Sequence, residues 1–100
     1  MNTKDKSNDR ESETVDVKVK FLGILPKFSD NKRVVEITLP ANPGAAVEQI
    51  IAKFGLPWKD NLEKITRIFV NNQHLATSIK NGVSLKNGDV IAFIQLSGGG

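Results

Sequence analysis

The fold of this chain is decided by its final stretch, Leu85-Lys86-Asn87-Gly88-Asp89-Val90-Ile91-Ala92-Phe93-Ile94-Gln95-Leu96-Ser97-Gly98-Gly99-Gly100. Asn-Gly predicts a tight turn, because both residues tolerate positive φ. The apolar run that follows has the length and composition of a buried strand. The last three glycines add nothing to a core, because glycine orders at the highest entropic cost. They do form a narrow peptide that can carry a free carboxylate into a site on another protein. The alternatives are a frayed chain end or an expression scar.

The sequence near the other end predicts a pair of strands. Val15, Val17, Val19 and Phe21 alternate with polar residues, which is the pattern of a half-buried strand. A second alternating stretch runs from Arg33 to Leu39. The connection between the two is short, so we expect an antiparallel hairpin.

One amphipathic helix follows the hairpin. Val47, Ile50, Ile51 and Phe54 fall at the spacing of a single helical face, with polar residues on the other side. Gly55 fits the left-handed position that follows a helix end. The helix is therefore expected to cover the sheet through this apolar stripe.

Two further strands are predicted after a linking segment, Leu56 to Lys64, in which the Trp58 ring packs on the edge of the core. Arg67-Ile68-Phe69-Val70 reads as a third strand. Asn71-Asn72 is typical of a hairpin turn, because asparagine tolerates positive φ. Gln73 to Ala76 is then a short return strand before the final one.

The order of elements predicts an α+β fold, with a mixed four- to five-stranded sheet and one helix packed on one face. Residues 1–14 have no apolar residue after Met1, so we expect a disordered tail there. The folded domain is predicted over residues 15–96, and residues 97–100 are expected to form a flexible tail.

Composition limits the chemistry of the chain. Its 100 residues contain no cysteine and one histidine, which excludes disulfides and thiolate metal sites, and we expect no metal site. No stretch is apolar enough to span a membrane and no secretory signal precedes the domain, so a cytoplasmic location is expected. The net charge of +3 comes without a dense Lys/Arg cluster, which argues against nucleic acid as a partner.

The order of strands, the helix Val47 to Phe54, the turn Leu85 to Asp89 and the Gly-Gly end together resemble the ubiquitin-like β-grasp sulfur carriers. The small subunit of molybdopterin synthase and the thiamine-biosynthesis sulfur carrier are the two types concerned. The resemblance covers residues 15–100. Those families end in a hydrophobic residue, one spacer and two glycines, which Leu96 to Gly99 match, with Gly100 left over.

The resemblance implies a carrier protein and not an enzyme. Its C-terminal glycine is adenylated and converted to a thiocarboxylate that donates sulfur in cofactor biosynthesis. The reactive residue is Gly100, or Gly99 if Gly100 is trimmed, and Gly98 and Gly99 enter the partner's site. The implied partners are a ubiquitin-activating-type adenylyltransferase, which uses the ATP, and a sulfur-acceptor synthase subunit, either the molybdopterin synthase large subunit or thiazole synthase. No cofactor is bound by the carrier itself.

A partner-binding patch is expected on the uncovered face of the sheet. If Val90, Ala92, Ile94 and Leu96 join the core, the opposite parity places Ile91 and Phe93 on this face. Phe69 and Arg67 on the neighbouring strand, together with Lys18 and Lys20, have matching parity. An apolar centre with a basic rim is typical of a docking surface.

The sequence alone leaves three functions open. The chain is either a sulfur carrier, with molybdopterin favoured over thiamine by the length of residues 15–100, or a ubiquitin-like modifier joined to lysines through its terminal glycine. A passive β-grasp binding module is the third reading, in which the glycine tail has no role.

Overall fold

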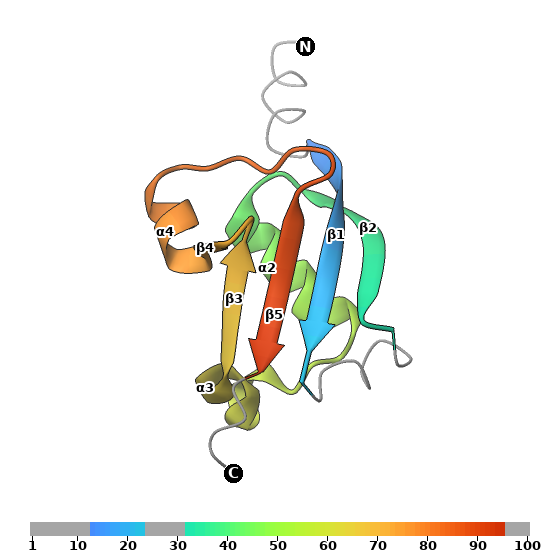
Figure 1. Cartoon of the computed structure of the whole chain (residues 1–100), viewed down its shortest axis with the longest axis vertical. Helices are drawn as coiled ribbons and strands as arrows, with labels where there is room; N and C mark the ends of the chain where they lie inside the picture. The colour runs from blue at the N-terminus through green and yellow to red at the C-terminus, as the bar shows by residue number, and fades with distance from the viewer. Residues whose placement is uncertain (1–12, 24–31, 96–100) are drawn as a thin grey trace, which may run out of the picture.

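The computed structural model describes residues 13–23 and 32–95, which form a mixed sheet with helices on one side (Figure 1). The sheet has five strands in the order β2-β1-β5-β3-β4. The strands are β1 (Thr14–Leu22), β2 (Val34–Pro40), β3 (Thr66–Val70), β4 (Gln73–His74) and β5 (Val90–Gln95). The predicted sheet is therefore confirmed with all five strands.

The strand β1 forms as its alternation predicts. Val17, Val19 and Phe21 are fully buried, while Lys18 and Lys20 between them are exposed. β1 pairs antiparallel with β2, which confirms the predicted hairpin. Of the residues that connect the two strands, 24–31 lie outside the described part of the chain.

The boundaries of the domain differ slightly from the expected ones. Most of the predicted tail lies outside the described residues, but Glu13 and Thr14 belong to the folded part. The Glu13 carbonyl accepts a hydrogen bond from the Ala41 N–H at 3.0 Å, and β1 begins at Thr14. Leu96 and the predicted tail 97–100 also lie outside the described residues.

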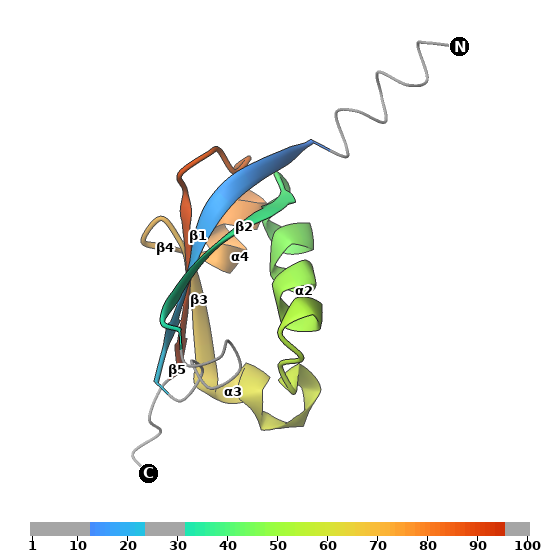
Figure 2. The same cartoon turned by 90° about the vertical axis from the view of Figure 1, so that its right-hand side faces the viewer.

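The helix α2 (Pro43–Lys53) crosses one face of the sheet, as predicted (Figure 2). Asn42 caps it, because its Oδ1 accepts from the Ala45 N–H at 3.0 Å. The helix is followed by Gly55, whose φ of +62° is the left-handed conformation expected of that position.

Two segments are more helical than the sequence indicated. The linking segment contains a π-helical turn η2 (Trp58–Leu62) and a short helix α3 (Glu63–Ile65). The return strand β4 stops at His74, and a helix α4 (Leu75–Lys80) replaces the expected strand residues Leu75 and Ala76. The spacing of Leu75 and Ile79 is the only helical signal there, and it is too short to outweigh the hairpin pattern.

The helices α2, α3 and α4 lie on the same side of the sheet, and the core fills the space between the layers (Figure 2). The residues with no exposed surface are Val17, Val19, Phe21, Ala46, Ile50, Ile91 and Phe93. Val47 is also buried, whereas Ile51 and Phe54 are half-buried at the edge of α2. The predicted helical stripe therefore does face the sheet.

The turn Leu85 to Asp89 fastens the beginning of β5 to β1. The Asp16 N–H donates to Asn87 Oδ1 at 2.9 Å, and the Gly88 N–H donates to the Asp16 carbonyl at 2.8 Å. The Lys18 N–H donates to the Asp89 carbonyl at 2.9 Å. These bonds start a parallel pairing in which Val19 lies beside Ile91 and Phe21 beside Phe93.

We expect Ile50→Ala to lower the free energy of unfolding by about 2–5 kcal/mol, because it removes a fully buried side chain. Urea denaturation measures the change. Gln49→Ala, at an exposed position of the same helix, is the matched control and should stay near the wild-type value. Equal losses of unfolding free energy in the two variants would show that α2 is rotated about its axis and that Ile50 does not face the core.

Candidate functional site

The expected reactive residues Gly98, Gly99 and Gly100 lie outside the described part of the chain, but the strand that leads to them is well defined. β5 is a central strand, parallel to β1 and antiparallel to β3. Near its end Ile94 pairs with Leu22 and with Arg67, and Gln95 pairs with Thr66. Ile94 is therefore the last residue of β5 that is paired on both sides, one residue before the strand ends.

The expected open-face position of Ile91 and Phe93 is wrong. Both side chains have no exposed surface. The register gives the reason, because Ile91 pairs with Val19 and Phe93 with Phe21, and directly paired residues share one face of a sheet. Both faces of β5 are apolar, so its sequence alone does not determine which side is buried.

Phe93 is the centre of an aromatic cluster in the core. Its ring centroid lies 5.7 Å from that of Phe21 and 6.0 Å from that of Trp58, the latter in an edge-to-face arrangement. The Phe21 ring in turn packs edge to face against the ring of Phe54, the residue that follows α2, with the two centroids 5.2 Å apart. The cluster joins the sheet to α2 and η2, and Trp58 is half-buried at the core edge as predicted.

The face of the sheet opposite the helices, called the open face below, is not covered by any other element of the described residues (Figure 2). Arg67, Phe69, Lys18 and Lys20 do lie on it, as the sequence predicted. The open face includes Lys18, Lys20 and Leu22 on β1, Val34 and Glu36 on β2, Arg67 and Phe69 on β3, His74 on β4, and Val90, Ala92 and Ile94 on β5.

The apolar centre of the open face consists of residues that sequence reasoning had placed in the core. Val90, Ala92 and Ile94 are half-buried. Ile94 lies between Leu22, which is 38% exposed, and the exposed Arg67. This apolar row with a guanidinium beside it lies one residue before the last described position, and it does not include the predicted Ile91 and Phe93.

Phe69 is less accessible than its strand parity indicated. It pairs with Ala92 on one side and His74 on the other. The His74 ring lies over it, with centroids 4.7 Å apart and planes inclined by 37°. Phe69 is therefore a half-buried aromatic whose remaining exposed surface lies beside the His74 imidazole.

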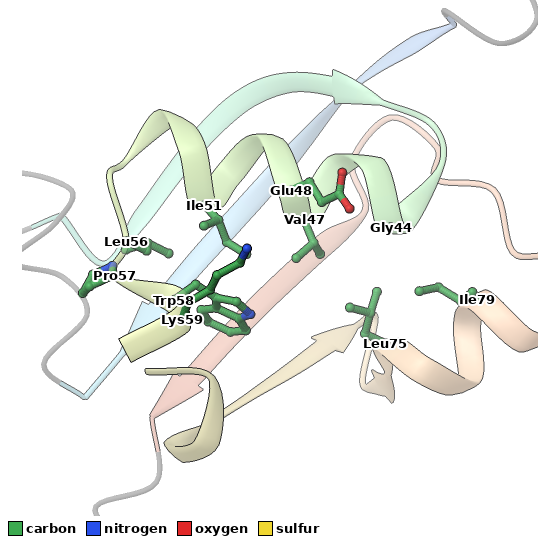
Figure 3. A pocket seen from close by; sticks show the side chains of 10 residues that line it. All are labelled: Gly44, Val47, Glu48, Ile51, Leu56, Pro57, Trp58, Lys59, Leu75 and Ile79. Atoms are coloured by element: carbon green, nitrogen blue, oxygen red, sulfur yellow. The ribbon is translucent and has the colours of Figure 1, made fainter. Parts of the chain in front are cut away.

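The helix side carries a hollow that the sequence did not reveal (Figure 3). It has a volume of about 740 Å³ and lies between α2 and α4, where Val47 and Ile51 face Leu75 and Ile79. Trp58 forms one end, and Glu48 and Lys59 are the charged residues of its lining. The spacing of Leu75 and Ile79 was the one signal for this surface.

Two negative findings apply to the residues that the structure describes. No group of three or more His, Cys, Asp or Glu side chains is arranged to hold a metal ion among them. No helix in the same part of the chain is long and apolar enough to cross a membrane.

A scan against protein-family models and a search of curated protein sequences each find no match. Solved structures do match. The small archaeal modifier protein 1 from Methanosarcina acetivorans aligns with a TM-score of 0.65 and 18% identity over 88% of this chain and 99% of that one. The putative molybdopterin converting factor subunit 1 from Pyrococcus furiosus aligns with a TM-score of 0.63 and 23% identity, covering 82% and 98%. The fold is the ubiquitin-like β-grasp.

A third β-grasp neighbour is CysO, an antigen of Mycobacterium tuberculosis, with a TM-score of 0.61 and 17% identity over 80% of this chain and 98% of that one. The predicted fold class is thereby confirmed. At these identities the likeness establishes the fold, so the function of this β-grasp domain has to be argued from its own residues.

The corrected faces of β5 predict different costs for two aromatic truncations. Phe93→Ala should lower the free energy of unfolding by about 3–5 kcal/mol, because the ring is fully buried. Phe69→Ala on the open face should cost less than half as much. Urea denaturation of both variants measures the difference, and a larger loss for Phe69→Ala would contradict the assignment of the two faces.

Proposed function

We propose that this β-grasp domain is a carrier of activated sulfur and not an enzyme with an active site of its own. The observation that carries the proposal is the combination of the fold with the sequence at the end of β5. A central strand held on both sides is followed by Leu96-Ser97 and three glycines. Glycines keep the peptide narrow, so a carboxylate at Gly100 can reach a nucleotide inside a partner enzyme.

The proposed chemistry needs two steps at the terminal carboxylate. A carboxylate oxygen attacks the α-phosphorus of ATP and pyrophosphate leaves, which gives an acyl adenylate. Hydrosulfide then attacks the carbonyl carbon and AMP leaves with the bonding electron pair. The thioacid loses its proton to give a thiocarboxylate, whose sulfur is nucleophilic. ATP and the catalytic groups belong to the activating enzyme, and because the step consumes cytoplasmic ATP we infer that the carrier acts in the cytoplasm.

The open face is proposed as the surface that partners grip. Its apolar row of Leu22 and Ile94 is next to Arg67, and Lys18 and Lys20 are exposed along β1. An apolar centre bordered by cations fits an apolar partner surface with an acidic rim. The same surface can serve in turn the adenylyltransferase and the subunit that receives the sulfur.

The pathway is proposed to be the synthesis of molybdopterin in preference to thiamine. The support is the length of residues 15–100 and the structural likeness to a protein described as a putative molybdopterin converting factor subunit. The molybdopterin synthase large subunit is then the acceptor, with thiazole synthase as the alternative.

A second candidate function is protein modification. Its support is the likeness to a neighbour that is named a modifier protein. In that case the acyl adenylate is passed on to a lysine amine and not to sulfide. Both functions begin with the same activation, so they share the reactive glycine.

Trimming the glycines tests the activation step. Deleting Gly99 and Gly100 should abolish ATP–pyrophosphate exchange by the adenylyltransferase that activates the full chain, while leaving the thermal midpoint nearly unchanged. Deleting Gly100 alone shows whether Gly100 or Gly99 is the acyl residue. Exchange that is equally fast with the full and the doubly trimmed chain would contradict the carrier proposal.

The same assay tests the docking surface. Arg67→Ala and Ile94→Ala should raise the KM for the carrier several-fold with little change in kcat, since binding residues act before the chemical step. Glu48→Ala on the helix side is the control and should leave the KM unchanged. An effect of Glu48→Ala with none from Arg67→Ala would place the partner on the opposite face.

A further inference from the structure

Gly23 occupies a place that no other amino acid can take without moving the end of β5. It is the first residue after β1, and its φ is +87°. A Cβ at this position would lie 2.7 Å from Gln95 Cβ and 2.8 Å from Gln95 Oε1. The Cβ of Gln95 is fixed by its own backbone, so it cannot swing away as the end of a long side chain does. Gln95 keeps its position only because residue 23 has no side chain.

The position of Gln95 matters because it is the base of the reactive tail. Five residues separate it from the carboxylate of Gly100, a span of at most about 17 Å. Gln95 pairs with Thr66 of β3 on one side and lies against Gly23 on the other. A shift of Gln95 therefore changes both the origin and the direction of the peptide that follows it.

We propose that Gly23 is a positioning residue for the reactive terminus. By leaving room for Gln95, it sets the direction in which the backbone leaves β5, while the open face sets where the domain docks. The consequence for catalysis rests on the proposed function, whereas the direction of the backbone is a property of the domain alone. Misplacing a reacting group by about 1 Å can cost a factor of about 100 in rate, so a small change in the direction of the backbone is enough to affect the reaction.

The chain contains a matched control for this proposal. Gly88 has a φ of +90°, nearly that of Gly23, and it lies in the turn that leads into the opposite end of β5. A Cβ at Gly88 would meet nothing within 4 Å. Alanine at either position therefore suffers the same backbone strain, but only alanine at position 23 collides with Gln95.

The first measurement needs no partner. The chain has no cysteine, so Lys20→Cys provides a single site for a nitroxide label close to Gly23. Paramagnetic broadening of the Leu96 and Ser97 amides in NMR spectra should change at least twofold in Gly23→Ala and stay unchanged in Gly88→Ala. Adding Gln95→Gly to Gly23→Ala removes the collision and should restore the original broadening. Equal broadening in the two alanine variants would overturn the proposal.

The second measurement is ATP–pyrophosphate exchange with unlabelled chains. Gly23→Ala should lower kcat about tenfold with the KM for the carrier within twofold, because docking on the open face is unaffected. Gly88→Ala should keep the wild-type kcat, and an equal loss in both variants would show that Gly23 has only a structural role. If the wild-type chain itself supports no exchange, the proposed function fails, and the broadening measurement still decides whether Gly23 directs the backbone.

Discussion

The rest of the structure depends on the parallel pairing of β1 with β5. These strands lie at opposite ends of the sequence, and a parallel pair cannot be closed by a hairpin. The turn Leu85 to Asp89 sets the register, because Asn87, Gly88 and Asp89 bond to Asp16 and Lys18 before β5 begins. Within the turn the Lys86 N–H also donates to Asp89 Oδ2 at 2.8 Å. Once the register is set, β1 and β5 run in the same direction and finish at the same end of the sheet (Figure 1). Gly23 therefore comes to lie beside Gln95.

The same register decides which side chains of β5 lie in the core and which lie on the open face. It places Phe93 under the helices with Phe21 and Trp58, where a fully buried ring contributes to the core. It turns Ile94 to the other side, between Leu22 and Arg67. Under the proposed carrier function, partners meet the open face while the buried face keeps the domain folded.

How far the sequence could predict each element depends on whether one of its faces is charged. β1 was predicted correctly because lysines mark its outer side, and α2 because its polar face is continuous. β5 is apolar on both sides, so its own sequence does not show which side is buried. That side is decided by the register of its pairing with β1, whose residues lie about 70 positions away, and hydrophobic periodicity carries no information on this register. Strand parity placed Arg67 and Phe69 correctly on the open face, whereas it placed Ile91 and Phe93 on the wrong face. The sequence gives no signal for the place of Gly23 beside Gln95, since these residues come together only in the folded chain.

The central claim is that the terminal carboxylate becomes a thiocarboxylate, and intact-mass analysis of the protein isolated from cells that make it tests this most directly. Because the chain contains no cysteine thiol, iodoacetamide at neutral pH should alkylate a thiocarboxylate much faster than the one remaining sulfur, the thioether of Met1. We expect a mass higher by the difference between one sulfur and one oxygen atom, located by fragmentation to the terminal glycine and shifted by a single alkylation. A chain that is found only with its ordinary carboxylate, or only joined to lysines of other proteins, would contradict it.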